Sequence, residues 1–261
     1  MIKVLRTGLR STPAGLGRIL HRSLKAVNLE FSGRVVTLLN RDGILTPSSI
    51  ILETDQIPAI NSAQFDGEIF HTDIFDAILK NRIDLALVPA KTLSTDAIRD
   101  KLRPYIEPME RSIMNAVLLV NGLSVSVPTE KLEAEVLKIE VERIQKCRSV
   151  EDAATALLGF GFGLTPSGDD FILGSIGVMQ LSGLDTEYLR PVIMSYNNVF
   201  SRTILLDGLD GYFPQPLLEV LEALESGSKL GDKIDKLKRI GHTSGFDMLA
   251  GMYYTAARSL P

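Results

Sequence analysis

Gly-Phe-Gly-Phe-Gly-Leu-Thr-Pro-Ser-Gly-Asp-Asp occupies residues 159–170, and the apolar run Phe-Ile-Leu leads to a further glycine at residue 174. The alternating glycines permit a backbone with positive φ that can approach a ligand closely, and Pro166 stiffens the chain before the next helix. We expect Ser167 to be the N-cap of a helix over residues 168–181, with Asp170 as the reciprocal acid of a capping box. Free N–H groups at such a helix start bind anions, helped by the helix dipole.

A second segment repeats this pattern near the end of the chain. Residues 241–251 read Gly-His-Thr-Ser-Gly-Phe-Asp-Met-Leu-Ala-Gly, so Ser-Gly-x-Asp-x-x-x-Gly occurs at 167–174 and again at 244–251. Gly174 and Gly251 lie two turns into their helices, where glycine costs about 0.5–1 kcal/mol relative to alanine. Because a destabilising glycine occurs at the same position in both helices, we predict that the two helices pack closely at these glycines and direct both N-termini toward one cavity.

The two helix starts define one candidate site for a small anionic metabolite. The residues predicted to bind the substrate lie in the loops, caps and first turns: Gly161, Gly163, Thr165, Ser167, Gly168, Thr243, Ser244, Gly245 and Asp247. Catalytic roles are predicted for His242, Asp169 and Asp170, with His242 as a proton shuttle. The acids would repel a bare phosphate, so they either face away and cap backbone N–H groups, or Asp169 and Asp170 ligate a divalent cation such as Mg²⁺.

Two other interpretations of the same residues stay open. The run Ser-Gly-Asp-Asp can be simply a well-capped helix start, in which the dipole stabilises each acid by roughly 0.3–1 kcal/mol. That interpretation explains Ser167 and Asp170 but not the three alternating glycines. The second interpretation is a Mg²⁺-dependent, nucleotide-using phosphotransferase. The absence of a P-loop lysine from this loop counts against it.

Length and composition exclude several classes of protein. A chain of 261 residues can bury a sizeable core, and its net charge of −4 offers no basic field for nucleic acid or anionic lipid. No apolar run reaches the ~18–20 residues of a membrane span, and the first twenty residues lack the apolar region of a signal peptide. The single cysteine, Cys147, suits a reducing compartment. We therefore expect a cytoplasmic protein with no nucleic-acid or membrane partner.

The distribution of turn signals and apolar periodicity predicts an α+β fold. The N-terminal region, residues 1–125, is expected to be strand-rich, as a small barrel or a curled antiparallel sheet, and the C-terminal region, residues 126–261, mostly α-helical. Strands are predicted at residues 27–31, 34–39, 49–52 and 64–71, and short helices at 13–25, 72–81 and 95–103. Helices of the second region are predicted at 129–146, 150–158, 168–181, 186–206, 214–225, 230–240 and 244–259.

The runs at residues 163–170 and 241–245 resemble the signatures of a bacterial family that includes the small subunit of oxamate carbamoyltransferase of allantoin degradation. Residues 26–29 and the pair Ser201 and Thr203 resemble it more weakly. The resemblance implies a transferase of purine catabolism that moves a carbamoyl group from carbamoyl phosphate to oxamate, within an assembly that contains other subunits. N–H groups near Gly168 and Gly245 would then clamp the carbamoyl carbonyl. A non-catalytic anion-binding or scaffolding subunit is the alternative.

Overall fold

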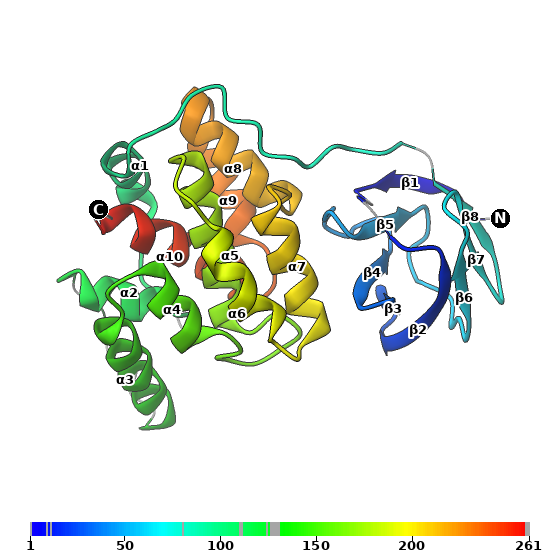
Figure 1. Cartoon of the computed structure of the whole chain (residues 1–261), viewed down its shortest axis with the longest axis horizontal. Helices are drawn as coiled ribbons and strands as arrows, with labels where there is room; N and C mark the ends of the chain where they lie inside the picture. The colour runs from blue at the N-terminus through cyan, green and yellow to red at the C-terminus, as the bar shows by residue number, and fades with distance from the viewer. Residues whose placement is uncertain are drawn as a thin grey trace. The chain divides into compact units, whose positions relative to one another are not determined.

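The computed structural model of the chain describes residues 2–8, 10, 12–79, 81–109, 112–123, 125 and 131–258. It contains two compact units, which Figure 1 shows together. The first unit comprises Met1–Ala86 with Tyr212–Gln215 and holds the strands. The second comprises Leu87–Gly211 with Pro216–Pro261 and holds the helices. The predicted α+β class is therefore confirmed.

One curled, nearly closed sheet of eight strands forms the first unit. Its strands, in spatial order, are β1 (Val4–Thr7), β5 (Ser49–Leu52), β4 (Arg34–Leu39), β3 (Ala26–Phe31), β2 (Gly15–Arg22), β6 (Ala63–Phe65), β7 (Ile69–Thr72) and β8 (Asp76–Ile78). Neighbouring strands are antiparallel except β4 and β5, which run parallel. The β3–β4 hairpin turns at Ser32 and Gly33, whose φ values of 48° and 82° are those that a tight two-residue turn requires.

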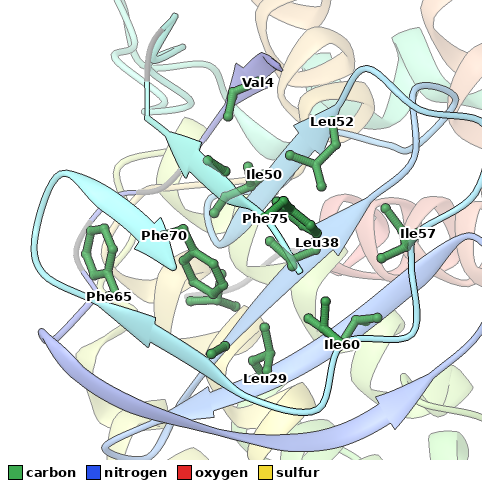
Figure 2. Close-up of a cluster of buried hydrophobic side chains, with 14 of the residues drawn as sticks. Val4, Leu29, Leu38, Ile50, Leu52, Ile57, Ile60, Phe65, Phe70 and Phe75 are labelled. Atoms are coloured by element: carbon green, nitrogen blue, oxygen red, sulfur yellow. The ribbon is translucent and has the colours of Figure 1, made fainter. Parts of the chain in front are cut away.

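Apolar side chains from these strands and their connections fill the interior of the sheet (Figure 2). The rings of Phe31 and Phe70 meet edge to face with their centroids 5.5 Å apart. Gly17 lies against the same core, because a Cβ there would sit 2.5 Å from Cζ of Phe31. A glycine inside this strand therefore makes room for a large core ring.

Two helices predicted in the first unit are wrong. Residues 13–25 contain β2, which pairs with β3 on one side and β6 on the other. Residues 72–81 contain β8, reached through a turn in which Thr72 Oγ1 accepts the N–H of Phe75 at 2.8 Å. In both segments long-range strand pairing outweighs a local pattern that is also compatible with a helix.

The second unit is built from ten described helices. They are α1 (Thr95–Leu102), α2 (Met114–Val120), α3 (Lys131–Lys146), α4 (Val150–Leu157), α5 (Ser167–Leu181), α6 (Arg190–Met194), α7 (Val199–Leu209), α8 (Gln215–Ser226), α9 (Leu230–Lys238) and α10 (Ser244–Ala257). The single helix predicted over 186–206 is wrong, because Asn198 starts a new helix there: its Oδ1 accepts the N–H groups of Phe200 and Ser201. The predicted start at Thr129 and end at Ser259 lie outside the described residues.

The division between the units falls elsewhere than the predicted regional boundary. The sheet unit ends at Ala86, and α1 and α2 pack against α10 in the helical unit. The regions 1–125 and 126–261 therefore stay a prediction about domains, while the compact units place residues 87–125 with the helices.

Helices α5 and α10 form the centre of the second unit. Most side chains of α5 are buried on every face, including Phe171 and Ile176, and α10 is buried in the same way from Asp247 to Ala256. A helix that is apolar nearly all round belongs in the core of a large fold. Among the described helices, none combines the length and the hydropathy that a membrane-spanning segment needs.

A hydroxyl cap fixes the helix that leads into the glycine-rich loop. Ser149 Oγ accepts the N–H of Asp152 at 3.0 Å at the start of α4. We expect Ser149→Ala to lower the free energy of unfolding by about 1 kcal/mol, measured by urea denaturation. Ser226→Ala is the control, since the hydroxyl of this exposed residue caps no helix start: it donates to the carbonyl of Glu222 and accepts the N–H of Ser228 at 3.3 Å. An equal loss in both variants would contradict the capping role.

Candidate functional site

The two central helices cross at the glycines that the repeated motif singles out. A Cβ on Gly174 would lie 2.0 Å from the carbonyl oxygen of Met248, and one on Gly251 would lie 1.9 Å from that of Phe171. Only glycine allows two helix backbones to approach this closely. The close packing of the two helices at Gly174 and Gly251, predicted from the sequence, is thus present.

The loop before α5 has the backbone that its glycines predict. Gly159, Gly161 and Gly163 have φ values of 77°, 114° and 103°, which favour glycine over other residues. The loop is tied to the start of α7, because Leu164 provides a carbonyl that accepts hydrogen bonds from Asn198 Nδ2 at 3.2 Å and Ser201 Oγ at 3.3 Å. The exposed glycine loop is therefore anchored by a residue pair more than thirty positions away.

The helix starts differ in detail from the predicted capping box. Pro166 is the N-cap of α5 and Ser167 its first residue, and the Pro166 carbonyl accepts the N–H groups of Asp169 at 2.8 Å and Asp170 at 3.2 Å. The N-cap residue of α5 makes no side-chain capping hydrogen bond. The predicted reciprocal bond with Asp170 is absent because that carboxyl group turns toward Thr165 and toward Ser244 of α10 instead.

Two of the predicted anion donors are occupied by the protein itself. The N–H of Gly168 donates to the carbonyl of Phe160 at 2.8 Å, and the N–H of Gly245 donates to the carbonyl of Ile240 at 3.2 Å. These groups therefore cannot clamp a carbonyl as they stand. Within the described part of the chain, the N–H groups of Ser167 and Ser244 have no hydrogen-bond partner. Free donors are thus present at both helix starts, one residue earlier than expected.

Three aspartates of the motifs are buried. Asp169, Asp170 and Asp247 are 2%, 3% and 0% exposed. Asp169 Oδ1 accepts the N–H of Gly159 at 2.7 Å, which agrees with the expectation that an acid caps the loop backbone. In each of the three carboxyl groups, Oδ2 is buried without a partner among the described residues. An unpaired buried acceptor costs about 1–3 kcal/mol, so a ligand, a water or a proton is needed to explain it.

Asp247 connects α10 to the start of α2. Its Oδ1 accepts Ser112 Oγ at 2.7 Å and the N–H of Ile113 at 3.0 Å. Burial raises the pKa of Asp247 to about 6, and hydrogen bonding from the side chains of Ser112, Thr243 and Ser167 limits the rise. The serine that begins α5 thus stabilises the acid in the first turn of α10.

Asp170 has the matching environment on the other helix. Burial raises its pKa well above the ordinary value, hydrogen bonding from the side chain of Ser244 opposes this, and the negative charge of Asp247 adds to it. The serine that begins α10 therefore stabilises the acid in the first turn of α5. The hydroxyl of each helix-start serine thus lies near the acid of the other helix, an arrangement that the sequence repeat alone did not predict.

Several residues of this site come from segments with no sequence motif. Glu140 of α3 is 7% exposed, and burial together with the charge of Asp247 raises its pKa to about 7. Ser112 contacts Asp247 from a distance of more than 130 residues in the chain. Burial raises the pKa of Asp169, and hydrogen bonding from Ser201, Gly159 and Tyr196 opposes it. Among Glu140, Ser112, Tyr196 and Ser201, only Ser201 had a signal in the sequence, through the family resemblance.

The other predicted site residues are accessible to different degrees. His242, Gly161 and Gly163 are exposed, whereas the side chains at both helix starts are half-buried: Thr165, Ser167, Thr243 and Ser244. No metal site is apparent in the described part of the chain, since no three His, Cys, Asp or Glu side chains gather there as ligands. A Mg²⁺ site that uses Asp169 and Asp170 therefore stays a prediction.

The sequence was compared with known protein families and with solved structures. No solved structure matches this chain. The family model of the oxamate carbamoyltransferase subunit AllH matches residues 157–256, which run from the end of α4 into the last turn of α10 and include both motifs. The match covers less than half of the chain, and it confirms the resemblance that the motifs predict. Over residues 157–256, the chain is similar to the family of the oxamate carbamoyltransferase subunit AllH.

Proposed function

We propose that the chain is a carbamoyltransferase-like subunit whose paired helix starts bind a small anion, either carbamoyl phosphate or a small carboxylate such as oxamate. The observation that carries this proposal is the pair of free N–H groups on Ser167 and Ser244, each at the positive end of a buried helix. Such groups favour an anion through both hydrogen bonding and the helix dipole. The family name supplies the reaction.

The buried acids need not repel such a ligand. Burial favours the neutral form of a carboxyl group, and it raises the pKa of Asp169, Asp170 and Asp247. A protonated carboxyl group carries no charge and can itself donate a hydrogen bond. Asp170, whose pKa lies well above its ordinary value, is therefore compatible with an anion beside it without a metal ion to screen it, whereas Asp247, with a pKa of about 6, is mostly charged at pH 7.

Carbamoyl transfer from carbamoyl phosphate to oxamate would proceed in one displacement. The amide nitrogen of oxamate attacks the carbamoyl carbon, the new C–N bond forms, and the C–O bond to phosphate breaks with its electron pair on the phosphate oxygen. The nitrogen loses one proton, which His242 would take and pass to the departing phosphate. Oxalurate and phosphate result. His242 is exposed, so its ring is accessible for this exchange.

A scaffolding role is the second candidate. It is favoured by the hydrogen bond from the N–H of Gly159 to Asp169, because through this bond the acid stabilises the loop itself, which is a structural role. AllH is the name of a subunit, which makes other subunits of the same assembly its plausible partners. In the scaffolding case those subunits would contain the whole catalytic centre.

Calorimetric titration separates the candidates. We expect the full chain to release or absorb heat with carbamoyl phosphate or with oxamate and not with Mg-ATP. Binding of Mg-ATP alone would favour the phosphotransferase interpretation. Binding of none of the three by a folded chain would contradict the anion-binding proposal and leave the scaffolding role.

His242→Ala tests the proton shuttle. Since the side chain is exposed, we expect the free energy of unfolding to change by less than about 0.5 kcal/mol. Carbamoyl transfer by the assembled enzyme should fall about 10²-fold, the lower end of the usual contribution of general acid–base catalysis. His21→Ala, an exposed histidine of the sheet unit, is the matched control and should leave turnover unchanged. Full activity of His242→Ala would remove His242 from the mechanism.

A further inference from the structure

Helices α4 and α5 and helices α9 and α10 are two copies of one helix–loop–helix arrangement. In both copies the second residue of the later helix, Gly168 or Gly245, packs on the earlier helix, where an added Cβ would lie 1.9 Å from the carbonyl oxygen of Leu157 or Leu237. In both, the N–H of that glycine donates to the carbonyl three residues after the leucine. The equivalence therefore extends from the motif to the preceding helix and loop.

The two copies contact each other by the same residues in exchange. Each late glycine, seven positions after its serine, packs on the carbonyl four positions after the serine of the other copy: Gly174 on Met248, and Gly251 on Phe171. The serine side chains approach the acids in the same exchanged way, Ser167 near Asp247 and Ser244 near Asp170. Exchange of equivalent contacts is what a two-fold relation produces.

Each copy leaves the same groups available for a ligand. The serine at the helix start has a free N–H and a half-buried hydroxyl. A glycine with positive φ lies over it: an added Cβ on Gly161 would be 2.8 Å from the nitrogen of Ser167, and one on Gly241 would be 3.1 Å from Oγ of Ser244. The absence of a side chain keeps the space beside each serine open.

A buried acid accompanies each of these serines. Asp247 belongs to the group around Ser167 and Asp170 to the group around Ser244, and they are 0% and 3% exposed. In both, Oδ2 is without a partner among the described residues, so each group contains an acceptor that awaits an N–H or O–H donor. Each group therefore combines donors for an anion with an acceptor for an amide.

We infer that the site consists of two half-sites of one design, one around Ser167 and Asp247 and one around Ser244 and Asp170, each holding one of two small anions that carry a carboxamide. This inference rests on the proposed function and specifies its substrates. Carbamoyl phosphate and oxamate both have this chemical structure, because each joins an H₂N–C(=O)– group to an anionic group. Duplicated half-sites would hold the two reactants side by side, as a bimolecular transfer requires.

Paired variants of the full chain test the inference by calorimetry, with carbamoyl phosphate and oxamate titrated separately. Ser167→Ala should weaken one ligand about 10-fold or more and leave the other within about 2-fold, and Ser244→Ala should do the reverse. Asp247→Asn should weaken binding of the same ligand as Ser167→Ala, and Asp170→Asn should weaken binding of the same ligand as Ser244→Ala. Ser226→Ala, on the exposed end of α8, should change neither.

The outcomes separate the inference from the proposed function. Weakening of the same single ligand by both serine variants would show one shared site, which overturns the half-sites and leaves the proposed function standing. Binding of neither ligand by the wild-type chain would overturn both. If an aspartate variant does not fold, as judged from its circular dichroism, the serine variants decide, because removal of a half-buried hydroxyl leaves the backbone contacts intact.

Discussion

Gly251→Ala is expected to lower the free energy of unfolding by about 3 kcal/mol or more, the upper range for overpacking of a core. The added methyl group would lie 1.9 Å from the carbonyl oxygen of Phe171 and 3.0 Å from Oγ of Ser175. The first of these atoms belongs to the backbone of α5, which is buried on nearly every face and cannot yield locally. Urea denaturation of the purified chain measures the loss.

Gly231→Ala is the matched control for this substitution. Gly231 is also a helical glycine, in α9, but its nearest neighbour is the ring of Tyr105 at 3.3 Å, a side chain that can move. Alanine has the higher helix propensity, so the control should be neutral or slightly stabilising. If Gly251→Ala were as stable as Gly231→Ala, the close crossing of α5 and α10 would be incorrect.

Glu140→Gln is expected to stabilise the protein at pH 8 by about 3 kcal/mol and to flatten its pH dependence. Burial and the charge of Asp247 raise the pKa of Glu140 from 4.5 to about 7 in the folded chain. Between these values the folded state binds more protons than the unfolded state. The contribution to stability is therefore complete below about pH 4.5 and lost as pH rises through 7.

Unfolding in urea at a series of pH values from 4 to 8 measures this effect. The wild-type chain should lose stability across the interval, and the variant should lose less, with a remaining slope below pH 6 from Asp247. Glu142→Gln is the control, because Glu142 is an exposed residue of the same helix, 4.0 Å from Lys138. An identical slope in wild type and Glu140→Gln would show that Glu140 is not held in its neutral form.

The half-site inference also explains why sequence alone gave an incomplete description of the acids. The spacing of Ser167 and Asp170 fits a capping box, and nothing within the segment argues against one. The side chain of Asp170 instead faces Ser244, which lies in a helix that begins more than seventy residues later in the chain. A local pattern cannot reveal that two copies of a motif exchange their partners, because the exchange depends on how the helices cross.

In the strand-rich unit, too, local sequence patterns do not reveal contacts between segments that are distant in the chain. Residues 27–31, 34–39 and 49–52 were predictable because β-branched residues and turn signals act locally. Residues 13–25 and 72–81 read as helices and are strands in part, because their hydrogen bonds are supplied by β3, β6 and β7. The parallel pairing of β4 with β5 likewise has no local signature.

The sequence by itself determined the α+β class, the positive φ values of the glycine loop and the close contact at Gly174 and Gly251. Each of these follows from the conformational freedom or the small size of residues at fixed spacing. Only the tertiary structure decided which N–H groups stay free, which acids share a site and that Ser112 and Glu140 join them. These depend on contacts between segments far apart in the chain, where burial and the direction of each hydrogen bond are set by packing.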